Sequence, residues 1–147
     1  MYASDVLDIV YSNVYDDCVS ELTSVRTMGS VPFAGRYRLI DFVLSGMVNS
    51  SIGKVGVSTK ANYQSLMDHL GSGKPWDLSR KRDGLTFLPP FNTTYADSYI
   101  GRLSALKGIN EYISKSGKDY VLLADCNVVC NMDYEKLIKA HISNDAD

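Results

Sequence analysis

The chain has 147 residues, of which 45% are hydrophobic and 22% are charged. This length predicts a single domain with a substantial core, and the composition is ordinary for a globular protein. A net charge of −2 gives no basic field to attract nucleic acid or an anionic membrane, so neither is expected as a partner. No apolar run approaches the roughly 20 residues of a membrane-spanning helix.

Three cysteines are present, and Cys126 and Cys130 lie close together in the sequence while Cys18 is distant. An odd number argues against a disulfide framework and favours the reducing cytoplasm. Cys126 and Cys130 are also potential metal ligands, but no second Cys or His pair has zinc-site spacing. We therefore expect reduced thiols in a cytoplasmic protein.

Short apolar strands alternate with amphipathic helices along the chain. The predicted strands are Val6–Tyr11, Lys54–Thr59, Leu85–Leu88 and Tyr120–Ala124. The predicted helices are Ile40–Ser51, a segment capped by Asn62 that runs to Leu70, a longer one from Tyr99 to Ile113 stopped by Gly117, and a last one capped by Asp133. Ser12–Ser30 is polar and irregular. This order predicts an α/β fold whose parallel sheet is covered on both faces.

Ligands of such sheets bind beyond the carboxyl ends of the strands. The candidate site is therefore built from the segments that follow Tyr11, Thr59, Leu88 and Ala124. In nucleotide-handling α/β proteins, the position occupied here by Asp125 is where a metal-binding carboxylate is expected.

One long segment, "VPFAGRYRLIDFVLSGMVNSSIGKVGVST" from Val31 to Thr59, resembles the glucose-1-phosphate adenylyltransferase (ADP-glucose pyrophosphorylase) family. The likeness continues through "ANYQSLMDHLGSGKPWDL", Leu88-Pro89 and Met132–Tyr134. It implies a three-layer, Rossmann-like nucleotidyltransferase domain of the nucleotide-diphospho-sugar transferase type, with a mainly parallel sheet. Residues 1–147 would form a truncated, N-terminal part of that domain, and the family's C-terminal left-handed β-helix domain is absent from this chain.

Enzymes of that family join ATP to glucose-1-phosphate, which gives ADP-glucose for glycogen or starch and releases pyrophosphate. The chemistry needs backbone N–H groups and cations around the triphosphate, and carboxylates that hold Mg²⁺. The resemblance therefore implies Mg²⁺ for a catalytic homologue.

The segment after the first strand departs from the family pattern. Where active members have a Gly-Gly-x-Gly-x-Arg run, this chain has "NVYDDC", Asn13–Cys18. No glycine remains, two carboxylates have entered, and Cys18 replaces the arginine. Met28-Gly29 likewise replaces a Lys-Pro pair. Carboxylates repel a triphosphate, so this loop is not expected to cradle one.

Further departures lie at the other strand ends. The family's base-contacting Leu-Pro-Ala-Gln-Gln becomes "LPPFN", Leu88–Asn92, and "YIGRLSAL" keeps Gly101 but has Ser104 in place of an acid. The metal-binding aspartate of the family falls on Asn127, which brings no charge. Asp125 lies two residues earlier.

These losses, within an intact framework motif, resemble the non-catalytic, regulatory-type subunit found in certain bacteria. We expect no catalytic residue, no metal ligand and no bound cofactor, and a vestigial nucleotide pocket at Asn13, Gly101, Asp125 and Asn127. The resemblance implies a partner that is a catalytic homologous subunit, a second copy of this chain, or both, since family oligomers are commonly tetrameric.

Arg26 and Arg38 match positions that contact a phosphorylated effector in regulated members, although Val25 replaces the neighbouring lysine. A local structural pair between Arg38 and Asp41 is the alternative. Two other functions remain open: an active adenylyltransferase that uses Asp125 and Arg102 as substitutes, and a sensor of a sugar phosphate or another effector.

Overall fold

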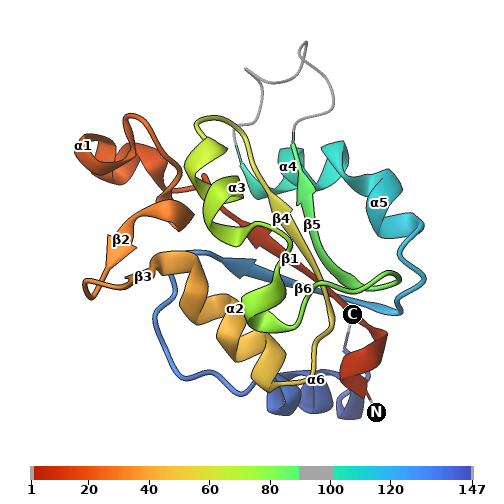
Figure 1. Ribbon diagram of the computed structural model, residues 1–147. Coiled ribbons are helices and arrows are strands. Elements are labelled where there is room, and N and C mark those ends of the chain that lie inside the picture. Colours follow the sequence, from red (N-terminus) through yellow and green to blue (C-terminus); the bar gives the residue numbers. More distant parts are fainter. Residues whose placement is uncertain (1, 90–100, 147) are drawn as a thin grey trace.

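The computed structural model describes residues 2–89 and 101–146, and its centre is a four-stranded parallel sheet (Figure 1). Its strands are β1 (Val6–Tyr11), β4 (Lys54–Ser58), β5 (Gly84–Leu88) and β6 (Tyr120–Asp125), in the order β5-β4-β1-β6. The four predicted strands are confirmed, each to within one residue at either end. The chain runs outward from β1 through β4 to β5 and then crosses back to β6. The order of the strands therefore reverses between β1 and β6, which is where ligands of such sheets bind.

Helices cover both faces of the sheet and confirm the three-layer α/β arrangement (Figure 1). The helices α2 (Leu39–Asn49), α3 (Gln64–Leu70) and α6 (Tyr134–Ser143) pack on one face, and α4 (Arg102–Gly108) and α5 (Asn110–Ser114) on the other. Alternation along β1 sends Val6 and Val10 to the first face and Leu7 and Ile9 to the second. A strand buried on both faces needs the continuous apolar sequence that β1 has.

Several short elements escaped prediction because they have only two to four residues each, too few to show a helical or strand periodicity. The polar segment after β1 contains η2 (Asp16–Val19), α1 (Ser20–Thr23) and η3 (Met28–Ser30), so it is not irregular throughout. A small antiparallel hairpin of β2 (Pro32–Phe33) and β3 (Tyr37–Arg38) precedes α2. The remaining short helices are η1 (Tyr2–Asp5) and η4 (Lys74–Trp76).

One predicted helix cap is confirmed and the other is wrong. Asp133 caps α6, and its carboxylate accepts a hydrogen bond from the Lys136 N–H at 3.3 Å. Asn62 is not a cap, because α3 begins at Gln64. Asn62 instead adopts a left-handed backbone conformation, with φ of 52°, and its amide donates to the Ser24 carbonyl. Asparagine tolerates this conformation better than most residues, so its turn preference prevailed over its capping preference.

The single long helix expected from Tyr99 to Ile113 is wrong as a continuous element. Its start, together with Pro90, Phe91 and Asn92 of "LPPFN", lies outside the described residues. The described part consists of α4 and α5, separated at Ile109, whose side chain is buried in the core on that face. Gly117 has a positive φ of 66° and lies three residues beyond the end of α5.

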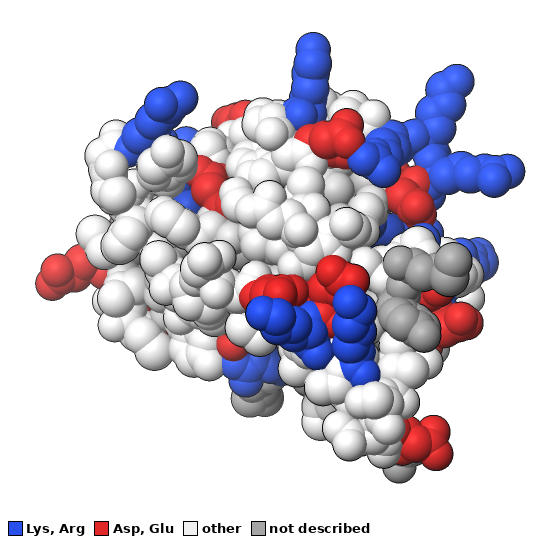
Figure 2. Space-filling model, turned by 90° about the horizontal axis from the view of Figure 1, so that it is seen from below, with Lys and Arg blue, Asp and Glu red and all other residues white. Residues whose placement is uncertain are grey.

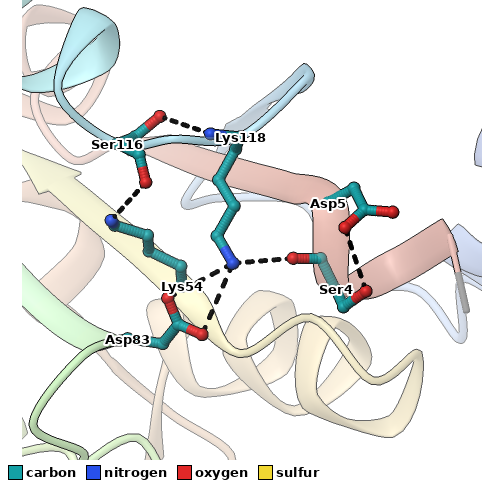
Figure 3. Close-up of polar contacts among 6 residues, drawn as sticks. All are labelled: Ser4, Asp5, Lys54, Asp83, Ser116 and Lys118. Carbon is teal, nitrogen blue, oxygen red and sulfur yellow. Dashed lines mark hydrogen bonds and ion pairs between the residues drawn. The ribbon is translucent and has the colours of Figure 1, made fainter.

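Two lysines fasten the amino-terminal ends of the strands (Figure 3). The Lys118 ammonium donates to the Ser4 carbonyl at 2.6 Å and lies 3.3 Å from the Asp83 carboxylate. Lys54, the first residue of β4, donates to the Ser116 carbonyl at 2.9 Å. Because these contacts join segments that precede β1, β5 and β6, they hold the edge of the sheet opposite the candidate site.

The surface seen in Figure 2 carries both signs of charge, with Lys and Arg interspersed among Asp and Glu beside a broad area without charged side chains. Over residues 2–89 and 101–146, no helix combines the length and apolar character needed to cross a membrane. All three cysteines are free, as expected, and Cys126 is the buried one.

A carboxylate is buried at the centre of the sheet. Asp8 lies between Val6 and Val10 on β1 and is fully buried, and among residues 2–89 and 101–146 the one group that stabilises its charged form is the Ile9 backbone N–H, which does not reach good hydrogen-bond geometry. Burial raises the pKa of Asp8 well above its ordinary value, because an ion is costly to place in an apolar core. Burial, with Asp8 as a secondary cause, also raises the pKa of Tyr134 to about 12.

The substitution Asp8→Asn is expected to stabilise the fold at neutral pH. The pKa of Asp8 is higher in the native state than its unfolded value of about 3.9. The wild type is therefore most stable below that unfolded pKa, and its free energy of unfolding falls as the pH rises from there through the native pKa. The variant stays neutral, so its free energy of unfolding should gain on that of the wild type by about 1.4 kcal/mol for each pH unit between the unfolded and the native pKa. Urea unfolding between pH 4 and pH 8 measures this difference.

Asp119→Asn is the matched control, because Asp119 is exposed just before β6. Its unfolding free energy should follow that of the wild type at each pH. An Asp8→Asn advantage that is absent, or that shrinks as pH rises, would contradict the assignment of Asp8 as a neutral, unpaired carboxyl.

Candidate functional site

A cleft of about 340 Å³ opens at the carboxyl ends of β1 and β4. It is lined by Tyr11, Ser12, Asn13 and Val14 after β1, by Ser58, Thr59 and Lys60 after β4, and by Asp17, Gly101 and Ala105. Two of the predicted pocket residues, Asn13 and Gly101, therefore lie together. Asp125 and Asn127, at the end of β6, are not among the residues that line this cleft.

The backbone hydrogen bonds of the sheet continue into the loops around the cleft. Ser12 N–H donates to the Ser58 carbonyl and Cys126 N–H to the Tyr11 carbonyl, both at 3.1 Å. The Ser12 hydroxyl adds a 2.8 Å bond to the Ser58 carbonyl. These bonds hold the first residue after β1 to the end of β4, and the first residue after β6 to the end of β1.

Asn13, at the position of the first family glycine, ties two loops together. Its side-chain oxygen accepts from the Lys60 N–H at 2.8 Å, and its amide donates to the Ala61 carbonyl at 3.1 Å and to the Asp16 carboxylate at 2.5 Å. The Asn13 side chain therefore holds the loop after β1 against the loop after β4. The Lys60 backbone N–H is bonded to this side chain, so it is not available to a phosphate.

Asp16, at the position of the third family glycine, is also part of the loop framework. Its carboxylate accepts from the Met28 N–H at 2.8 Å as well as from Asn13. Burial raises the pKa of Asp16, while these hydrogen bonds act in the opposite direction. The Met28 N–H is therefore bonded to a fixed carboxylate within the chain.

The predicted metal-site carboxylate is paired with an arginine. The Arg102 guanidinium approaches both oxygens of Asp125, with Nη2–Oδ2 at 2.5 Å and Nε–Oδ1 at 3.1 Å. The same guanidinium donates to the Tyr15 hydroxyl at 2.6 Å and lies 5.5 Å from the centre of that ring. Hydrogen bonding to Asp125, and secondarily to Tyr15, raises the pKa of Arg102 further above its ordinary value. The three side chains join the first loop, the start of α4 and the end of β6, and we call them the Arg102 clamp.

The Arg102 clamp does not fit a Mg²⁺ ion. Mg²⁺ prefers carboxylate and phosphate oxygens, and Asp125 already directs both of its oxygens at an internal cation. Among residues 2–89 and 101–146, no group of three or more Asp, Glu, His or Cys side chains is arranged to hold a metal. Asn127 follows in the turn after β6, partly exposed, and supplies no charge.

Cys126, between Asp125 and Asn127, anchors this turn in the core. Its side chain is 2% exposed, and its sulfur lies 3.6 Å from the Ser12 carbonyl. Burial raises the pKa of the Cys126 thiol to about 12, so it remains a neutral thiol at physiological pH. A buried neutral thiol is a packing residue and not a nucleophile.

Of the two arginines predicted to bind an effector, Arg38 is engaged within the chain. Its guanidinium donates to the Ser65 carbonyl and hydroxyl, both at 2.7 Å. Asp41 accepts from the backbone N–H of Arg38 at 2.9 Å and contacts His69 Nε2 at 2.6 Å, so the expected Arg38–Asp41 pair forms through the backbone only. Arg26 is partly exposed, and no contact between its side chain and Arg38 is found in the described residues.

Sequence reasoning missed the partners of Asp125. Arg102 was recognised only as an alternative source of charge, and Tyr15 was named only as one residue of the segment "NVYDDC". The available signal was the sequence "IGR", which places an arginine directly after the glycine that begins α4, at the same end of the sheet as Asp125.

Comparison with known proteins agrees with this architecture. Residues 19–147 match the family model described as "Nucleotidyl transferase", and the chain belongs to that family. It is 43% identical over 143 residues to "Glycogen biosynthesis protein GlgD" of Geobacillus stearothermophilus, an alignment that covers 97% of this chain and 42% of the relative. It is 39% identical to the protein of the same name from Bacillus subtilis (strain 168), over 96% of this chain and 41% of the relative.

A third relative is "Glucose-1-phosphate adenylyltransferase" of Pseudothermotoga lettingae, 39% identical over 97% of this chain and 34% of the relative. The chain therefore spans less than half the length of these relatives. The resemblance inferred from the Val31–Thr59 segment is confirmed, and it extends to both kinds of relative.

Removing the Arg102 clamp is expected to loosen the first loop with little effect on global stability. Arg102 is 43% exposed, so its ion pair contributes less than about 1 kcal/mol. In Arg102→Gln, amide hydrogen exchange at residues 13–18 should speed up several-fold because Tyr15 loses its tether. Arg80→Gln, which removes an exposed pair with Asp77, is the control and should leave residues 13–18 unchanged. Unaltered exchange in Arg102→Gln would show that the clamp does not restrain the loop.

Proposed function

We propose that this chain is part of a regulatory, catalytically silent member of the glucose-1-phosphate adenylyltransferase group, which supports ADP-glucose synthesis from ATP and glucose-1-phosphate for glycogen biosynthesis. The single observation that carries the proposal is the Arg102–Asp125 pair. The family's metal-binding aspartate falls on the neutral Asn127, and the nearby carboxylate that could replace it, Asp125, is already neutralised by Arg102.

The first loop supports the same conclusion. A triphosphate needs backbone N–H groups and cations at this point, as the helix-terminus phosphate sites of nucleotide-binding folds illustrate. Here the Met28 N–H is bonded to Asp16, and Asp17 adds a second, exposed carboxylate. Both charges oppose the approach of a polyphosphate.

The alternative of an active enzyme with substitute residues is less well supported. That alternative required Asp125 for the metal and Arg102 for charge. Because Arg102 and Asp125 bond to each other, using either one would first require breaking their contact. An effector-sensor role at Arg26 and Arg38 would require Arg38 to leave Ser65.

The proposal includes a partner and a location. A chain kept for its fold and surfaces would act by association with a catalytic homologous subunit, with itself, or with both, in a commonly tetrameric assembly. The relatives' additional length leaves room for the β-helix domain expected from the resemblance. Free cysteines favour a cytoplasmic setting.

Catalytic silence is tested by a steady-state assay of ADP-glucose formation with ATP, glucose-1-phosphate and Mg²⁺. The purified full-length protein, of which this chain is a part, should turn over at least about 1000-fold more slowly than the roughly 1–1000 per second typical of enzymes. A catalytic homologue assayed in parallel serves as the positive control. Turnover within the ordinary range by this protein alone would refute the proposal.

The regulatory role has its own test. Mixed with a catalytic homologue, the protein should change the homologue's apparent substrate affinity by about 5–150-fold, the range of typical coupling free energies. The control is the homologue mixed with the same protein after heat denaturation. Association without any change in the homologue's kinetics would indicate a purely structural subunit.

A further inference from the structure

One side of helix α2 faces solvent without carrying any charge. Residues 39–53 contain a single charged residue, Asp41, and its side chain is buried. The outer side of α2 presents Phe42, which is partly exposed, and Ser45 and Asn49, which are exposed. These three residues recur at helical spacing and therefore form one stripe. A surface helix normally carries charged side chains on its outer face, so this stripe is unusual for a face in contact with water.

Exposed aromatic side chains continue the stripe beyond the amino end of α2. Phe33 and Tyr37, in the β2–β3 hairpin, are 43% and 47% exposed. Their rings lie edge-on to the Phe42 ring, with centroids 5.5 and 5.7 Å from it. The hairpin is thus attached to α2 through a cluster of three aromatic rings that remains open to solvent.

The loop after β6 borders α2 as well. Residues 127–132 contain no charged residue, and the Met132 carbonyl lies against Gly46 of α2. The apolar side chains of this loop, those of Val128, Val129 and Met132, are all exposed. We call the hairpin, the α2 stripe and this loop the uncharged face. Figure 2 views the molecule from the side on which α2 and α6 lie in Figure 1, and a broad area there lacks charged side chains. Monomeric proteins rarely expose a large contiguous area of this kind unless it contacts another molecule.

Opposite charges lie at the two ends of α2. Arg36, at the tip of the hairpin that precedes α2, is exposed, and within the described residues its side chain has no ion pair or hydrogen bond. Asp133 lies near the carboxyl end of α2, because the N–H of the next residue, Tyr134, donates to the Ser50 hydroxyl at 3.0 Å. The Asp133 side chain is 49% exposed, although it also lies 3.3 Å from the Lys136 ammonium. The uncharged face is therefore bordered by a cation at one end and an anion at the other.

A second copy of this chain is complementary to such a face. A two-fold axis perpendicular to α2 and close to Ser45 would place the α2 helices of two copies antiparallel, with stripe against stripe. The small side chain of Ser45 allows two helices to approach closely at that point. The same symmetry brings Arg36 of each copy to Asp133 of the other, which gives two equivalent pairs of opposite charge at the rim. A parallel arrangement would instead place like charges together.

We infer that the uncharged face is a self-association surface, on which a second copy of this chain docks with its α2 helix antiparallel. Phe33, Tyr37 and Phe42 supply the aromatic anchors that typically dominate the binding energy of such interfaces. The inference rests on the proposed function only in its choice of partner, since it assigns the second copy named there to a defined surface. It does not depend on whether the protein turns over a substrate.

The test is sedimentation velocity of the full-length protein, of which this chain is a part, over a range of concentrations. The wild type should form an assembly with an even number of copies. Ser45→Arg places a charged side chain at the centre of the uncharged face and should raise the dissociation constant at least about tenfold. Ser45 is exposed, so the circular dichroism of the variant should match that of the wild type. Ser114→Arg, at an exposed serine of α5 on the other face of the sheet, is the matched control and should leave the dissociation constant unchanged.

A pair of charge variants tests the antiparallel arrangement. Arg36→Glu places two carboxylates together at each end of the interface and should weaken association about tenfold. Adding Asp133→Asn removes that repulsion and keeps the cap of α6, because asparagine caps a helix as well as aspartate does. The double variant should therefore recover at least about threefold of the lost affinity. Adding Asp119→Asn to Arg36→Glu, which alters an exposed carboxylate just before β6, should recover none.

Four results would overturn the inference. They are a monomeric wild type, a Ser45→Arg protein that associates as the wild type does, no recovery with Asp133→Asn, and association with a catalytic homologue alone. A lower melting temperature of the dissociated Ser45→Arg protein would also overturn it, because the face would then be covered by another part of the same polypeptide. The ADP-glucose assay is read separately, so failure here and failure of the proposed function are distinguishable.

Discussion

The structure depends on the burial of β1 between two parallel neighbours and two helical layers. Each of its six residues is at most 2% exposed, including Asp8. Because β4 and β6 pair with β1 in a fixed parallel register, their carboxyl ends are brought to the same edge. The positions of Ser12, Thr59 and Asp125 all follow from that pairing. A fold so determined can lose chemical groups from its loops and still present those loops in the same place.

Under the proposed function, the loss of chemistry at this edge takes the form of internal neutralisation. In an active site of this class, fixed cations and a metal would be complementary to the charge of the incoming phosphates. Here the Arg102 guanidinium meets Asp125, the Asp16 carboxylate meets the Met28 N–H, and the Asn13 amide meets neighbouring loop groups. Each of these groups has a partner within the chain. The remaining cleft is consequently polar but not anion-attracting.

The sequence was sufficient to predict the sheet, because the buried strands are continuous apolar runs and the apolar residues of the helices recur at helical spacing. It also predicted which positions depart from the family pattern, since a departure is a change of residue type at a position that can be counted from the framework motif. The Arg102 clamp was not predictable in the same way, because Tyr15, Arg102 and Asp125 are far apart in the chain and only the packed sheet brings them together. The break at Ile109 and the turn at Asn62 were missed because tertiary packing and a left-handed backbone overrode local helix signals.

The fastening of the amino-terminal edge by Lys118 has a consequence for synthesis of the protein. The bond from Lys118 to the Ser4 carbonyl spans 114 positions, and β1 needs the equally remote β6 as its second neighbour. At about 5–20 residues per second, the ribosome releases the first strand on the order of ten seconds before the last arrives. During that interval β1 has one flank uncovered, and an unpaired strand edge is open to non-native pairing until β6 has been made.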